Sequence, residues 1–88
     1  MSSKKSVLQF PCTFPVKVMG RNTDEFTALV NSIFAKHLPS LDDAEMSRRL
    51  SNGDKYLSIT VTFQARSQEQ LDEIYEELNG HKLVLMTL

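Results

Sequence analysis

One alternating stretch decides the fold: Tyr56-Leu57-Ser58-Ile59-Thr60-Val61-Thr62-Phe63-Gln64. Its odd-numbered positions are apolar, and its even-numbered positions carry hydroxyl or amide groups. A period of two, with β-branched and aromatic residues, is typical of a strand that buries one face and exposes the other. The dipeptide Asn52-Gly53 just before it favours a hairpin turn. We therefore expect an antiparallel partner strand over residues 46–51.

An amphipathic helix is predicted before this hairpin, over residues 23–38. Apolar residues recur there at steps of three and four, which puts them on one face of a helix. Asn22 and Glu25 have the spacing of a capping box, and Pro39 ends the helix.

A second helix is predicted after the hairpin. Ser67 and Gln70 form another capping box, and apolar residues follow at helical spacing. Asn79-Gly80 is a typical C-terminal stop. Five acidic residues cover the other side of this helix, and we interpret them as a solvated face rather than a metal or acid–base site.

Two further strands complete the pattern, at residues 14–19 before Gly20 and at residues 82–88. The order β-α-β-β-α-β predicts an α+β, ferredoxin-like sandwich, in which two helices cover one face of a four-stranded antiparallel sheet. The expected spatial order is strand four, one, three, two. We assign residues 13–88 to this single domain and residues 1–12 to a flexible N-terminal segment.

The composition of the chain excludes several classes of function. The 88 residues carry 10 basic and 11 acidic side chains, a net charge of −1, which argues against a general binder of nucleic acid. A single cysteine, Cys12, excludes an intrachain disulfide and a multi-cysteine metal site. We expect no cofactor, no metal and no membrane partner. The N-terminus shows no secretory signal, so a cytoplasmic location is expected.

Five stretches of the chain are similar to a known family: Phe10-Pro11, Val18-Met19-Gly20, Ser58-Ile59-Thr60-Val61, Tyr75-Glu76-Glu77-Leu78 and Val84-Leu85-Met86-Thr87-Leu88. With them the chain resembles, over residues 8–88, the YbeD-like proteins, a family of small uncharacterised bacterial proteins. That resemblance implies a ferredoxin-like fold similar to the ACT regulatory domains that bind amino acids, and a link to lipoate metabolism through neighbouring genes.

The first strand-to-helix turn is the candidate ligand site. Gly20 allows close approach of the backbone, Arg21 offers a bidentate cation, and the helix start at Asn22 presents free N–H groups to an anion. The same residues also fit a plain turn glycine, a solvated arginine and a helix cap. The pattern leaves both interpretations open.

The face of the sheet opposite the helices is the candidate partner surface. Lys17, Arg49 and Tyr56 are expected to point there, among the hydroxyl groups of the third strand. Such a mildly basic face could recognise an acidic protein or a small anion, and it could equally be a solvated face.

Other functions that occur on this topology fit the sequence less well. An RNA-recognition module needs aromatic residues at the centre of strands one and three, where this chain has Lys17, Ser58 and Thr60. A small hydrolase like acylphosphatase would use Arg21 as an anion anchor, but the third strand lacks the asparagine that orients water there. His37 and His81 are assigned to the surface.

The last strand, residues 82–88, is apolar on both alternations, although it is expected at an edge of the sheet. An apolar edge is an aggregation hazard unless something covers it, so a homodimer through that edge or through the open face is a hypothesis. Taken together, the residues predict a non-enzymatic regulatory or interaction domain with a protein partner or a small acidic ligand.

Overall fold

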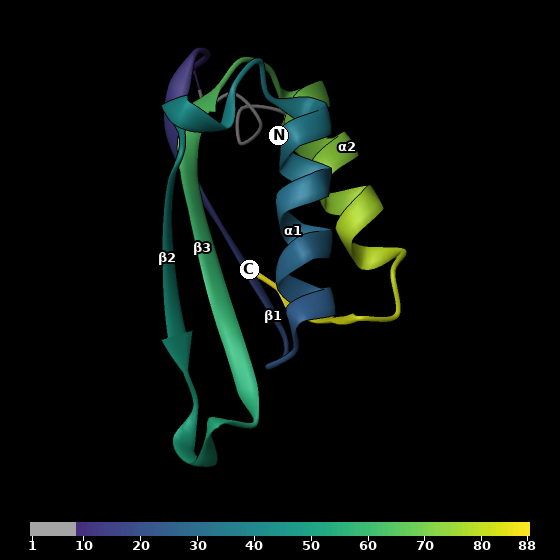
Figure 1. Ribbon diagram of the computed structural model, residues 1–88. Helices are drawn as coiled ribbons and strands as arrows, with labels where there is room; N and C mark the ends of the chain where they lie inside the picture. The colour runs from purple at the N-terminus through teal and green to yellow at the C-terminus, as the bar shows by residue number, and fades with distance from the viewer. Residues whose placement is uncertain (1–8) are drawn as a thin grey trace, which may run out of the picture.

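The long strand β3 (Tyr56–Ala65) is one of the two inner strands of the sheet. A computed structural model describes residues 9–88, and Figure 1 shows their arrangement. On one side β3 pairs antiparallel with β1 (Cys12–Arg21), and on the other with β2 (Glu45–Leu50). The short strand β4 (Val84–Thr87) pairs antiparallel with β1. The order β2-β3-β1-β4 confirms the predicted topology.

Two helices, α1 (Asp24–His37) and α2 (Gln68–Asn79), cover the same face of the sheet. Seen edge-on in Figure 1, the sheet forms one layer and the helices the other, which confirms the α+β, ferredoxin-like sandwich. The connection between β2 and β3 extends past the ends of the helices, so the helix layer does not reach that end of the hairpin. No helix in the described part of the chain is long and apolar enough to cross a membrane.

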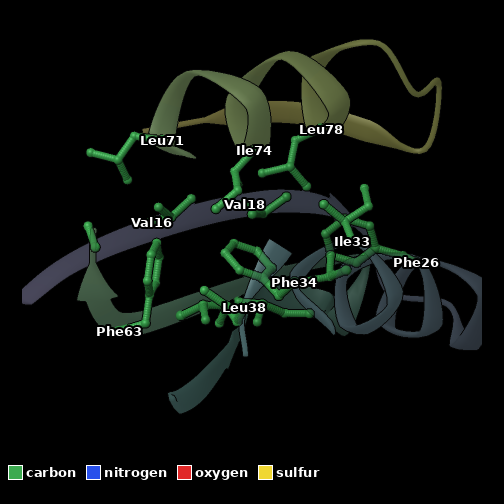
Figure 2. Close-up of a cluster of buried hydrophobic side chains, with 14 of the residues drawn as sticks. Val16, Val18, Phe26, Ile33, Phe34, Leu38, Phe63, Leu71, Ile74 and Leu78 are labelled. Atoms are coloured by element: carbon green, nitrogen blue, oxygen red, sulfur yellow. The ribbon is translucent and has the colours of Figure 1, made fainter. Parts of the chain in front are cut away.

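The core fills the space between these layers (Figure 2). Phe26 and Ile74, from the two helices, belong to one buried cluster with Val18, Ile59 and Val61 of the sheet. Burial of each such side chain stabilises the fold by about 1.5–3 kcal/mol. The other buried members are Val16, Val30, Ile33, Phe34, Leu38, Leu57, Phe63, Ala65, Leu71 and Leu78.

The start of α1 differs from the prediction. Thr23, not Asn22, is the N-cap, and its Oγ1 accepts a hydrogen bond from the Phe26 N–H. Asn22 instead donates from Nδ2 to the carbonyl oxygen of Asp54 in the β2–β3 connection. The Asn22 side chain, which the local pattern assigns to the helix cap, therefore forms its hydrogen bond with the distant β2–β3 connection instead.

The predicted two-residue turn between β2 and β3 is also longer than expected. Residues 51–55 join the strands, and positive φ angles occur at Gly53 (79°) and Asp54 (56°). The connection closes where the Ser51 N–H donates to the carbonyl oxygen of Tyr56.

The second helix begins and ends as predicted, with two local differences. Ser67 is the N-cap, but Gln70 accepts from the Arg66 N–H rather than from the cap residue itself. Gly80 follows the helix with a φ of −82°, so it is not in the left-handed conformation.

Both ends of the domain depart from the expected boundaries. Residues 1–8 of the predicted flexible segment lie outside the described residues. Phe10 packs against the core and Cys12 pairs with Ala65, so the assignment of these two residues to a flexible segment is wrong. The last strand begins at Val84 rather than at residue 82, because the Val84 N–H donates to the carbonyl oxygen of His81 and residues 82 and 83 lie in the turn that this bond closes.

Candidate functional site: the open face of the sheet

The strands place alternate side chains on the face that the helices leave open. In β1 and β3 the buried residues alternate with residues that point away from the core. Residues opposite one another in the register share a face. This defines the open face, made up of Thr13, Pro15, Lys17, Met19 and Arg21 from β1, Tyr56, Ser58, Thr60, Thr62 and Gln64 from β3, Glu45, Ser47 and Arg49 from β2, and Met86 from β4.

Two shallow hollows lie next to one another on this face. The first, of about 310 Å³, is lined by Lys17, Ser47, Arg48, Arg49, Ser58 and Thr60. The second, of about 330 Å³, is lined by Lys17, Met19, Arg49, Leu50, Ser51, Tyr56 and Ser58. The hollows share Lys17, Arg49 and Ser58, so they lie side by side at these residues, and we refer to the two together as the trough. The structure therefore brings together the three residues predicted as a partner surface.

The trough is cationic. On β3, Lys17 stands opposite Thr60 and Arg49 stands opposite Ser58, so their neighbours on that strand carry hydroxyl groups. On its other side Lys17 exchanges backbone hydrogen bonds with Leu88. The ion pairs found among residues 9–88 involve Lys36 and His37, and none reaches Lys17 or Arg49. Two charges of the same sign thus face solvent over a surface rich in hydrogen-bonding groups.

Arg21 belongs to this face as well. It is the register partner of Tyr56, and its guanidinium carbon lies 5.9 Å from the centroid of the Tyr56 ring, a cation–π contact. The arginine predicted for the strand-to-helix turn therefore extends the cationic surface beyond the trough.

The structure separates the other two residues of the predicted ligand turn. A Cβ at position 20 would lie 2.5 Å from the Phe26 ring and 2.6 Å from the carbonyl oxygen of Leu83, so the close approach at Gly20 is made by the core. The side chain of Asn22 is bonded to the β2–β3 connection. A hollow of about 230 Å³ beside Arg21 is lined by neither of them, and its charged lining residues are Arg21, Glu25 and Lys82.

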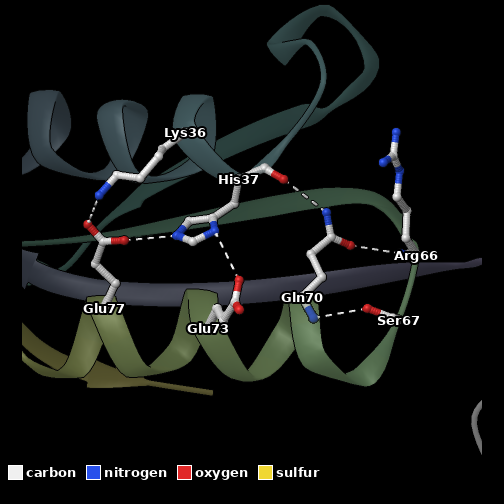
Figure 3. A network of polar contacts seen from close by, with 7 residues as sticks. All are labelled: Lys36, His37, Arg66, Ser67, Gln70, Glu73 and Glu77. Carbon is white, nitrogen blue, oxygen red and sulfur yellow. Dashed lines mark hydrogen bonds and ion pairs between the residues drawn. The ribbon is translucent and has the colours of Figure 1, made fainter.

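Figure 3 shows a polar network that the sequence analysis missed. Glu77 of α2 accepts from Nζ of Lys36 at 2.6 Å and from Nε2 of His37 at 2.8 Å. These hydrogen bonds from Lys36 and His37 lower the pKa of the Glu77 carboxyl group. Gln70 donates to the carbonyl oxygen of His37 at 3.0 Å. The His37 side chain, which is assigned to the surface from the sequence, is half-buried there (15 % exposed) and is bonded to Glu77.

Groups that could hold a metal are dispersed. Within the described residues, no three histidine, cysteine, aspartate or glutamate side chains gather as a metal site. Cys12 is half-buried in β1. The acidic residues on the outer side of α2, Glu69, Asp72, Glu73 and Glu76, are exposed. The charged surfaces of the molecule are thus a cationic sheet face and an acidic helix face.

Comparison with known proteins places the chain in a family. A family model described as "Protein of unknown function (DUF493)" matches residues 5–88. The chain belongs to this family. It is 41 % identical over 86 residues to UPF0250 protein NE1487 of Nitrosomonas europaea, covering 98 % of this chain and 99 % of that one. A UPF0250 protein of Chromobacterium violaceum is 40 % identical over 85 residues, covering 97 % of this chain and 96 % of that one.

These DUF493 relatives confirm the resemblance to the YbeD-like proteins and its extent along the chain. The solution structure of protein HP0495 from H. pylori superimposes with a TM-score of 0.78, covering 100 % of this chain and 93 % of that one. Its sequence is 20 % identical, so this likeness shows the shared fold.

Proposed function

We propose that this DUF493 protein is a non-enzymatic interaction domain that binds an acidic segment of a partner protein on the open face of its sheet. One observation carries the proposal: Lys17 and Arg49 line a single trough and form no ion pair within residues 9–88. Carboxylates of a partner would supply the missing counter-charges, and the hydroxyls of Ser58 and Thr60 would donate further hydrogen bonds.

The lining of the trough favours binding over catalysis. Neither of its two hollows is lined by a histidine, a cysteine or a carboxylate, which are the side chains that usually activate a nucleophile or transfer a proton. Arg21, the anion anchor of the hydrolase alternative, lies over the Tyr56 ring. The trough does contain serine hydroxyls and Lys17, but no histidine or carboxylate lines it to activate a hydroxyl group, and this favours recognition of charge over catalysis.

The same lining favours a protein over RNA. Single-stranded RNA is recognised by stacking of bases on aromatic side chains at the centre of the sheet. On the described strands, Tyr56 is the one aromatic residue of the open face, and it stands at the first position of β3. The centre of the face is occupied by Lys17, Ser58 and Thr60, which suit carboxylates better than bases.

Charge reversal tests the proposal. The probe is a fluorescently labelled polyglutamate peptide, and binding is measured by anisotropy at low ionic strength for the wild type and for a Lys17→Glu/Arg49→Glu variant. Loss of two charge-assisted contacts of about 1–2 kcal/mol each predicts that affinity falls at least about tenfold. Citrate as a competitor shows whether a small anion occupies the same trough.

Arg66→Glu/Lys82→Glu is the matched control, because it reverses the same number of charges at two exposed cations outside the trough. It should bind polyglutamate within about twofold of the wild type. Equal loss of binding in the control and in the Lys17→Glu/Arg49→Glu variant would show general charge attraction and would contradict a specific site.

A further inference from the structure

The edge strand β2 borders the trough and is exposed along its whole length. All of its residues, Glu45–Leu50, are exposed, and its one strand neighbour is β3. The helix layer does not cover it, so Met46 and Leu50, whose side chains lie on the helix side of the sheet, are 38 % and 47 % exposed. An exposed edge strand without proline is a template for pairing with another extended segment.

The register shows which backbone groups are available. Ser51 donates its N–H to the carbonyl oxygen of Tyr56, and bonded and non-bonded pairs alternate along an antiparallel ladder. Glu45, Ser47 and Arg49 therefore bond to β3, and Met46, Arg48 and Leu50 direct their N–H and C=O groups outward. Within residues 9–88 no other segment forms a backbone hydrogen bond to these outward groups.

The two faces of β2 differ in chemistry. On the open face Arg49 borders the trough, with Lys17 beyond it. On the helix side a hollow of about 340 Å³ is lined by Asn22, Arg48, Leu50 and Leu57, which has room for an apolar side chain. A strand added beside β2 would place its alternate residues over these two faces in turn.

We infer that the partner segment binds as a fifth strand beside β2, and that it alternates acidic residues, which face Arg49 and Lys17, with apolar residues, which face Met46 and Leu50. The inference rests on the proposed function and names the form of the acidic partner. Backbone hydrogen bonds would supply affinity, and the alternation of side chains would supply specificity.

The opposite edge of the sheet and a second copy of the chain are poorer candidates. At β4, the Tyr75 hydroxyl donates to the carbonyl oxygen of Leu88, and the Thr87 hydroxyl donates to Oδ1 of Asn79. Side chains of α2 therefore already form hydrogen bonds with that edge strand. Antiparallel pairing of two β2 strands about Arg48 would set the two Arg48 side chains opposite one another, and like charges opposite one another destabilise a sheet. Pairing about Ser47 would set Glu45 opposite Arg49 but would bring no carboxylate to Lys17.

Three synthetic peptides test this inference. The first alternates valine and glutamate, the second has the same composition with the glutamates and valines in separate blocks, and the third is the alternating peptide with alternate backbone nitrogens methylated on its pairing edge. We expect the alternating peptide to bind at least about tenfold more tightly than the methylated one, because methylation removes several hydrogen bonds. The block peptide should bind at an intermediate level through charge alone.

Amide hydrogen exchange locates the binding. In the complex with the alternating peptide, the amides of Met46, Arg48 and Leu50 should exchange more slowly, whereas those of Ser47 and Arg49 are already protected by β3. Arg48→Pro should weaken binding more than Arg48→Ala, because proline removes an outward N–H without touching the bonds to β3. The methylated peptide gives the same test without altering the protein.

Equal binding of the alternating and methylated peptides, with unchanged exchange at Met46, Arg48 and Leu50, would overturn the inference and leave the proposed function intact. Slower exchange at these amides on concentrating the protein without peptide would assign the edge to a second copy and would also overturn it. Failure of polyglutamate and of all three peptides to bind would overturn both proposals.

Discussion

Oε1 of Glu77 lies 2.8 Å from Nε2 of His37, and this contact joins the last turn of α1 to the third turn of α2. Because hydrogen bonds from Lys36 and His37 lower the pKa of Glu77 below its ordinary 4.5, the ionised carboxylate is favoured in the folded state. Its contribution to stability is therefore present above the unfolded pKa and is lost as the pH falls through the lower, folded pKa.

We expect Glu77→Gln to lower the urea midpoint at pH 7, and the difference from the wild type to shrink as the pH falls below about 4.5. Urea titrations at several pH values measure this difference. Glu76→Gln is the control, because Glu76 is exposed on the same helix and forms no ion pair among the described residues. A difference that grows at acid pH would contradict the assignment.

Gly20→Ala should destabilise the fold by about 1–3 kcal/mol, because the new methyl group would overlap the buried Phe26 ring and the Leu83 carbonyl oxygen. Urea denaturation followed by circular dichroism gives the change. Gly80→Ala should cost less, since its Cβ would meet the Glu76 carbonyl oxygen at 3.3 Å and its φ suits alanine. A fully stable Gly20→Ala protein would reopen the interpretation of Gly20 as a ligand-binding residue.

Thr23→Ala should cost about 1 kcal/mol through loss of the helix cap, whereas Thr23→Ser should retain most of the stability. Amide exchange distinguishes the cap from its neighbour. The Phe26 amide should exchange faster in Thr23→Ala and remain protected in Asn22→Ala. The reverse pattern would restore Asn22 as the capping residue.

Tyr75→Phe should cost about 0.5–1.5 kcal/mol, because the Tyr75 hydroxyl donates to the carbonyl oxygen of Leu88 at 3.1 Å. Partial burial raises the pKa of Tyr75, so the hydroxyl remains a donor through neutral pH. Thermal unfolding and exchange at the Leu88 amide report the change. Tyr56→Phe, at an exposed position on the open face, should have little effect on either measurement.

The periodic spacing of apolar residues in the sequence predicts most of the fold. Both helices, the central strand and the strand order follow from it, because alternation and helical spacing determine which face of each element is buried. The surface formed by Lys17, Arg49 and Tyr56 follows from the same alternation once the sheet is assembled.

The errors arise where a distant contact overrides a local preference. Asn22 and Thr23 are both good caps, and only the position of Asp54, 32 residues away, decides between them. The pair His37 and Glu77 is separated by 40 residues, and its clue in the sequence was weak: two basic residues ending one helix and acids spaced by four on the next. Arg21 joins the open face because β1 continues past Gly20, where the predicted strand ended, so that Arg21 follows the alternation of Lys17 and Met19 and pairs with Tyr56.

The separation of charge between the two layers makes the molecule an electric dipole despite a net charge of only −1. A nearly neutral dipole is only weakly attracted to a distant anion, but the field of the anion exerts a torque that turns the cationic side of the molecule toward the anion. At physiological ionic strength this torque acts within about 8 Å, so it guides the final reorientation of an encounter rather than the search that precedes it. Productive collisions should therefore become more frequent in dilute buffer, even though the isoelectric point of about 6.1 suggests a nearly neutral particle.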